Sequence, residues 1–78
     1  MRVKERRLIV AFYTTHDAMA FEDHCLARGA AGRLIPLPRE ISAGCGLAWS
    51  APPDDGPALR ALLAEAGITP QHLRELEI

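Results

Sequence analysis

Residues 33–51, RLIPLPREISAGCGLAWSA, contain two short apolar segments separated by a loop. The first, residues 33–37, is typical of a strand that Pro36 and Pro38 bring to an end, because proline has no N–H to donate to a ladder. The second, residues 47–51, is also typical of a strand. We therefore predict a strand, a loop and a strand in direct succession.

An apolar run at residues 8–13, LIVAFY, precedes this pair and predicts a buried strand. Thr14 and Asp17 follow at the spacing of a capping box, so a helix is expected to begin here. Apolar residues recur at helical spacing along it: Ala18, Phe21, Cys25 and Ala27. Gly29 is expected to end the helix, and Cys25 is expected to pack in the core as a small apolar residue.

On the C-terminal side, residues 52–55, PPDD, predict a turn whose carboxylates cap a second helix. The apolar stripe of that helix consists of Ala58, Leu59, Leu62, Leu63 and Ala66. Gly67 is expected to end it. After Pro70, residues 73–78 predict a fourth strand.

The predicted order of elements is strand, helix, strand, strand, helix, strand. Four strands with two helices on one face form the ferredoxin-like arrangement, so the predicted fold class is α+β, a two-layer βαββαβ sandwich with an antiparallel sheet. The 78 residues are expected to form one domain, residues 1–78. A chain this short buries only about 60–65% of the surface that its unfolded form exposes, so a partner or a homodimer would add stability.

Composition and charge argue against several classes of function. The formal net charge is −1, so the chain has no general attraction to nucleic acid. The start of the chain, MRVKERR, is basic, but the apolar run behind it is too short for a signal-peptide core or a membrane span. We therefore expect a cytoplasmic protein without a membrane partner. Its two cysteines are too few for a secreted disulfide framework and should rest as thiols.

Cys45, which lies between Gly44 and Gly46 in the loop, is the strongest candidate for chemistry. A cysteine reacts as its thiolate, which nearby cations and backbone N–H groups stabilise. The two glycines would give a partner access to the sulfur, and they permit the positive φ that lets N–H groups converge on an anion. Arg39 in the same loop and Arg33 on the preceding strand are candidate counter-charges. The alternative is a tight turn that holds a small buried residue.

The histidines and a metal centre receive less support from the sequence. His16 and His24 are eight residues apart, which is not the i, i+4 spacing of a helical zinc site. His16 lies at the strand-to-helix turn, where it is either a solvated residue or a base or proton relay for Cys45. His72 is expected at the surface. A site built from His16, Cys25, Cys45 and an acid has no supporting spacing, so we predict no metal and no other cofactor.

Three segments carry a family resemblance: FYTTHDAMAFED, GRLIPLPREISAGCGLAW and ALRALLAEAGI. The most specific part is residues 34–46, and residues 15–17, THD, support it. With these segments, the chain from about residue 8 to residue 68 is similar to the selenium/sulfur carrier-like proteins, a small bacterial family of unknown function. The resemblance implies a small α/β sandwich and a sulfur- or selenium-carrying role for Cys45. Cys25 lies outside the motif.

Three functions follow as hypotheses. In the first, the chain is a carrier rather than an enzyme: Cys45 holds a persulfide or selenopersulfide that a donor protein supplies and an acceptor protein receives. Gly44, Gly46 and Arg39 would support that thiolate. In the second, the chain is a ferredoxin-like protein-binding or regulatory module with an incidental cysteine. In the third, it is a redox sensor in which Cys25 and Cys45 pair, which requires Cα atoms within about 7 Å.

Overall fold

The computed structural model describes residues 4–78, so the first three residues of the basic MRVKERR segment lie outside the described part. Within residues 4–78 the elements follow in the order β1 (Arg6–Ala11), α1 (Thr15–Arg28), β2 (Arg33–Pro36), β3 (Leu47–Ala51), a 3-10 turn η1 (Pro53–Asp55), α2 (Gly56–Ala66) and β4 (His72–Glu77). This is the predicted βαββαβ order. The α+β, ferredoxin-like fold is therefore confirmed.

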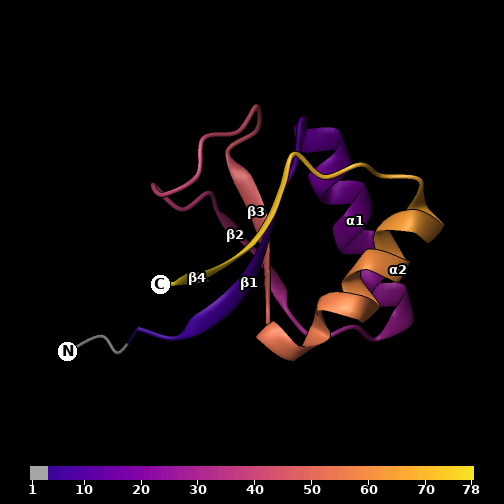
Figure 1. Ribbon diagram of the computed structural model, residues 1–78. Helices are drawn as coiled ribbons and strands as arrows, with labels where there is room; N and C mark the ends of the chain where they lie inside the picture. The colour runs from indigo at the N-terminus through magenta and orange to yellow at the C-terminus, as the bar shows by residue number, and fades with distance from the viewer. Residues whose placement is uncertain (1–3) are drawn as a thin grey trace.

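The sheet has the strand order β2-β3-β1-β4, and each neighbouring pair is antiparallel. Both helices lie on one face of it, with α1 packed against α2 (Figure 1). One row of paired residues crosses the whole sheet: Leu34, Trp49, Val10 and Leu73. The side chains of this row belong to the core on the helix side. They fix the register, because a slip of one residue would turn them to the opposite face.

The main core lies between the sheet and the helices. Phe21 of α1 is fully buried, and its ring centroid lies 5.6 Å from that of Phe12 and 5.9 Å from that of Trp49. Helix α2 adds Leu59 and Leu63 to the same cluster. Burial of each large side chain stabilises the fold by roughly 1.5–3 kcal/mol, so these few residues hold the helices to the sheet.

The helix ends follow local signals with one exception. Thr14 Oγ1 accepts a hydrogen bond from Asp17 N at 3.0 Å, and Gly29 and Gly67 end α1 and α2 in the left-handed conformation. The predicted carboxylate cap of α2 is wrong, because Asp55 at the N-cap makes no side-chain hydrogen bond to the helix. Asp55 belongs to the turn η1 and lacks the extended backbone from which a cap side chain reaches the free N–H groups. Neither helix of the described residues has the length and apolar character needed to cross a membrane.

The bounds of one strand and the burial of two helix residues differ from expectation. Strand β1 spans Arg6–Ala11 rather than residues 8–13, because its pairing with β4 covers those residues. Ala27 is exposed, since two residues beyond Cys25 correspond to a rotation of about 200° around the helix. Ala58 is exposed as well, so the apolar face of α2 is narrower than predicted.

The loop of residues 37–46 covers the face of the sheet opposite the helices. Ile41 of this loop is buried in a second cluster with Ile9, Ala11 and Ala48. Strand β1 is therefore covered on both faces. This explains why residues 8–11 of the strand are apolar without interruption rather than alternating.

Candidate functional site

Cys45 lies at the end of the loop, two residues before β3, and its side chain faces the core. The residue is 5% exposed and belongs to the same packed cluster as Phe12 and Trp49. Its Sγ donates a hydrogen bond to the Leu47 carbonyl oxygen at 3.2 Å, and the Leu47 N–H donates to Sγ, with N and Sγ 3.4 Å apart. The thiol is thus shielded from solvent and bonded within its own hairpin.

The two glycines that flank Cys45 have different surroundings. A Cβ on Gly44 would lie 2.5 Å from the Tyr13 carbonyl oxygen, so only glycine lets the loop approach the end of β1 this closely. A Cβ on Gly46 would have no neighbouring atom within 4 Å, so the space beside this residue is open. Neither glycine adopts the positive φ expected from the sequence, so an N–H nest of alternating backbone conformations is not formed here.

Gln71, which precedes β4, and His72, its first residue, contact the loop from a distant part of the chain. The Gly44 N–H donates to Gln71 Oε1 at 2.9 Å, and His72 Nε2 lies 2.8 Å from the Ser42 carbonyl oxygen. Because a carbonyl oxygen only accepts, His72 donates this bond from Nε2. No sequence pattern indicates these contacts, since the partners are 27 and 30 residues apart. They tie the Cys45 loop to the segment that follows α2.

The two arginines expected as counter-charges lie in different places. Arg39 is exposed in the loop, and its support of the thiolate stays a prediction. Arg33 begins β2 and pairs with Ser50. At about 3.3 Å per strand residue, Ser50 is roughly 10 Å along β3 from Leu47, at the end of the hairpin away from the loop. Arg33 is therefore not a counter-charge for Cys45 in this conformation.

Cys25 is fully buried in the last turns of α1, and burial raises the pKa of its thiol to about 11. The thiol is consequently protonated at neutral pH and unreactive. Helix α1 ends near Arg33, whereas Cys45 lies at the opposite end of the β2–β3 hairpin. Both cysteines are free, and their placement argues against a redox pair.

His16 and His24 have structural surroundings rather than a metal site. The His16 side chain is 91% exposed, with Nδ1 3.9 Å from Asp17 Oδ1, which matches a solvated residue at a helix start. His24 Nε2 lies 3.0 Å from Glu65 Oε1, and Arg28 reaches the same oxygen at 2.8 Å, so this group links α1 to α2. Over residues 4–78, no group of three or more His, Cys, Asp or Glu side chains is placed to hold a metal.

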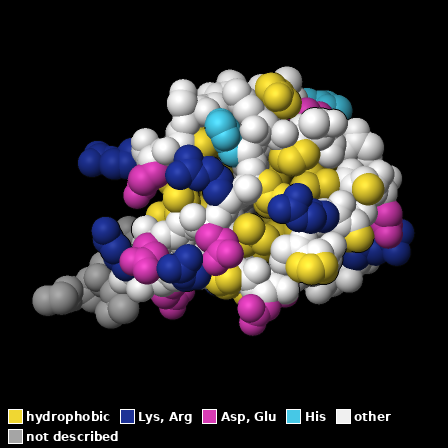
Figure 2. Space-filling view, viewed as in Figure 1, with side chains coloured by type: hydrophobic (Ala, Val, Ile, Leu, Met, Phe, Trp, Pro, Cys, Tyr) yellow, Lys and Arg dark blue, Asp and Glu magenta, His cyan; other side chains and the backbone are white. Residues whose placement is uncertain are grey.

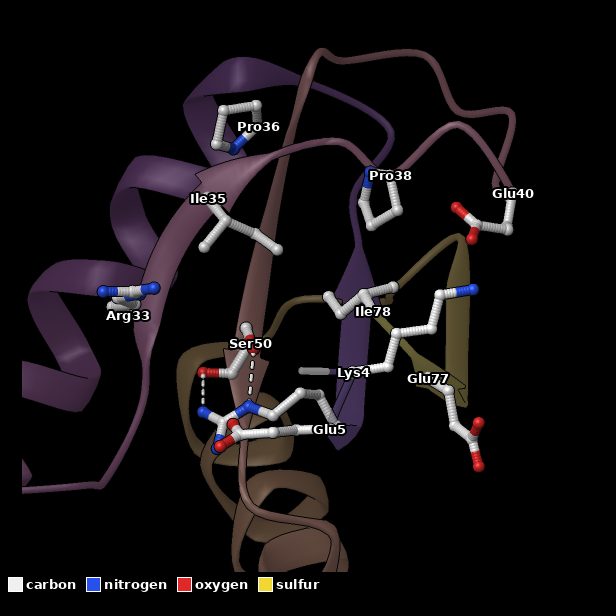
Figure 3. A pocket seen from close by; sticks show the side chains of 11 residues that line it. Lys4, Glu5, Arg33, Ile35, Pro36, Pro38, Glu40, Ser50, Glu77 and Ile78 are labelled. Carbon is white, nitrogen blue, oxygen red and sulfur yellow. Dashed lines mark hydrogen bonds between the residues drawn. The ribbon is translucent and has the colours of Figure 1, made fainter. Parts of the chain in front are cut away.

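A groove of about 710 Å³ lies on the sheet face opposite the helices (Figure 3). Six charged residues of both signs line it: Lys4, Arg7, Arg33, Glu5, Glu40 and Glu77. The Arg7 guanidinium is held by Ser50, with Nε donating to Oγ at 3.0 Å. Three positive and three negative side chains cancel, so the groove has no charge preference for an anion or a cation. Cys45 is not part of its lining.

Apolar side chains gather on the face that carries α2 and β4 (Figure 2). A smaller groove there, of about 280 Å³, includes Leu63, Ile68, Pro70 and Leu73 in its lining. Elsewhere on the described surface, Met19 and Leu26 of α1 are more than half exposed. The apolar groove is the surface suited to contact with another protein, whereas single exposed apolar side chains are common on any protein surface.

The sequence profile of one protein family, described as "Putative Se/S carrier protein-like", matches residues 7–75. The matched range covers most of the chain and includes the loop with Cys45. No curated protein and no solved structure gives a significant match.

Proposed function

The chain belongs to the Se/S carrier protein-like family, and on this premise we propose that it carries sulfur or selenium on Cys45 between a donor and an acceptor protein. The observation that carries the proposal is the difference between its two thiols. Cys25 is fixed in the core with a pKa of about 11, whereas Cys45 lies in a loop beside the open space at Gly46. Cys45 is 5% exposed, so it is the thiol that a partner would reach once its loop moves, whereas Cys25 would need α1 to open.

The transfer is a thiol exchange that balances without an oxidant or a reductant. The Cys45 thiolate attacks the outer sulfur of a donor persulfide. A sulfur–sulfur bond forms on Cys45 as that of the donor breaks, and the electron pair of the broken bond leaves on the donor thiolate. The same exchange with an acceptor thiolate delivers the sulfur. A donor with a terminal selenium atom would leave a selenopersulfide on Cys45 by the same bond changes.

A carrier role fits the surfaces of the molecule better than a catalytic one. Enzymes of small substrates usually enclose them in a concave and largely apolar pocket. The larger groove lies on the other face of the sheet from the core cluster that holds Cys45, and its charges cancel. The reaction would therefore take place in a complex with the donor or acceptor, whose site would supply the remaining groups.

The test is intact-mass spectrometry of the reduced protein after incubation with a cysteine desulfurase and cysteine. We expect a gain of one sulfur atom that a reducing agent removes. Cys45→Ser should abolish the gain, and Cys25→Ser, the matched control, should retain it. A gain that persists in Cys45→Ser, or its absence in the unmodified chain, would contradict the proposal.

The second candidate is a protein-binding or regulatory module, which the apolar groove between α2 and β4 favours. In that case Cys45 is only a small core residue, in agreement with its burial. Sedimentation velocity of the unmodified chain and of Cys45→Ser separates the two functions. Self-association that Cys45→Ser leaves unchanged, together with no sulfur loading, would support the binding module.

A further inference from the structure

The loop around Cys45 is held by two kinds of contact. Ile41 is buried on the sheet face opposite the helices, and the Leu37 N–H donates to the Gly46 carbonyl oxygen at 2.9 Å. These contacts fix the two ends of residues 42–45. Between them, Cys45 packs in the main core and Ala43 packs against the second cluster. The only hydrogen bonds described from residues 42–44 to a distant part of the chain are the solvent-exposed ones to Gln71 and His72.

We propose that Gln71 and His72 are positioning residues that latch residues 42–45 closed over the Cys45 thiol. The inference rests on the proposed function, since a carrier must present a thiol that is 5% exposed in this structure. Opening of residues 42–45 would release Cys45 from the core. The rest of the fold, including Ile41, would stay in place.

The contacts around the loop would let residues 42–45 move without disturbing the helices or the sheet. Gly46 has no side chain and no atom within 4 Å of the position of a Cβ, and glycine permits φ values that other residues avoid, so Gly46 is suited to serve as one hinge. Gly44 would only withdraw from the Tyr13 backbone that it touches. The two Sγ hydrogen bonds go to a single residue, Leu47, and break together.

His72 contributes a single donated hydrogen bond to the latch. Its Nε2 donates to the Ser42 carbonyl oxygen, and both the neutral tautomer with Nε2–H and the imidazolium ion retain that donor. A docking partner could release the latch by offering other hydrogen-bond partners to Gln71 and His72. Loss of one exposed hydrogen bond corresponds to about a 2- to 12-fold change in an equilibrium.

The experiment measures alkylation of the native, reduced chain by iodoacetamide, with peptide mass spectrometry reading each cysteine. Gln71→Ala and His72→Ala should each increase the alkylation rate of Cys45 by about 2- to 12-fold, and the two effects should multiply in the double variant. Arg74→Ala, an exposed substitution on the same strand, is the matched control and should leave the rate unchanged. Cys25 reports global unfolding, because its side chain is fully buried in α1.

Two results would overturn the latch. One is an unchanged Cys45 rate in both single variants. The other is a parallel increase at Cys25 and Cys45, or an equal increase in Arg74→Ala, which would mean that the variants loosen the whole fold. Sulfur loading by a desulfurase is measured separately. Faster alkylation without loading would reject the carrier function alone, and loading without faster alkylation would reject the latch alone.

Discussion

Gly44 and Gly46 flank the same cysteine, yet only one of them is required by close packing. At Gly44 the loop touches the backbone at the end of β1, whereas Gly46 faces open space. The symmetry of the Gly-Cys-Gly motif suggests one shared role for the glycines, namely access to the sulfur. In the structure the two glycines differ in role: Gly44 allows close packing against β1, and only Gly46 lies beside free space.

This difference predicts opposite tolerance to alanine. Gly44→Ala would place a Cβ 2.5 Å from the Tyr13 carbonyl oxygen, so we expect a loss of about 1–3 kcal/mol in the free energy of unfolding. Gly46→Ala, with no positive φ and no neighbouring atom, should stay within about 0.5 kcal/mol of the unmodified chain. Urea denaturation measures both, and equal losses would contradict the packing described for Gly44.

The Cys25 thiol predicts a loss of stability in alkali. Its pKa rises from 9.0 to about 11 because burial disfavours the thiolate. The folded chain therefore holds this proton more tightly than the unfolded chain, and the resulting stability is fully present below pH 9. It is lost progressively as pH rises from 9 to about 11. Urea denaturation of the unmodified chain and of Cys25→Ala over this range checks the effect, since the variant should show a flatter pH dependence.

At the scale of elements, the sequence predicts well those helix and strand ends that local chemistry determines. The start of α1 at Thr14 and the two glycine ends depend on neighbouring residues, and β3 was predicted with its observed bounds. The start of α2 was predicted less well, because η1 places Asp55 in a turn conformation that composition does not reveal. Local signals thus determine where most elements begin and end, and tertiary contacts decide the remainder.

The Thr14 cap predicts a measurable contribution to α1. Thr14→Ala removes the oxygen that accepts from the Asp17 N–H, so we expect a loss of about 1 kcal/mol in the free energy of unfolding. Thr15→Ala is the matched control, because Thr15 is the first residue of the helix and is exposed. It should change stability by less than about 0.5 kcal/mol. A loss at Thr15 as large as that at Thr14 would rule out the capping explanation.

At the scale of the whole molecule, the candidate site was only half predictable. Cys45 stands out in the sequence because it lies between glycines, but its placement depends on the bonds of its own sulfur to Leu47 and on the contacts of the adjacent Gly44 with Tyr13 and Gln71. Two of these partners are distant in the chain, so no local pattern indicates them. The two-layer fold was predictable because the periodic apolar residues of the helices and strands define its core. The loop that covers the other face of the sheet was not.

That loop forms a partial third layer, which predicts that a residue outside every helix and strand contributes to global stability. Ile41 is 4% exposed and packs in the cluster that contains Ile9, Ala11 and Ala48. Ile41→Ala would leave a cavity on that face, so we expect a loss of about 2–4 kcal/mol. Ser42→Ala is the matched control, because the Ser42 side chain is exposed and its bond to His72 uses the backbone carbonyl. Urea denaturation should show the loss for Ile41 alone. If Ile41→Ala unfolded at the same urea concentration as the unmodified chain, the loop would be a surface segment and the fold would be stable with two layers.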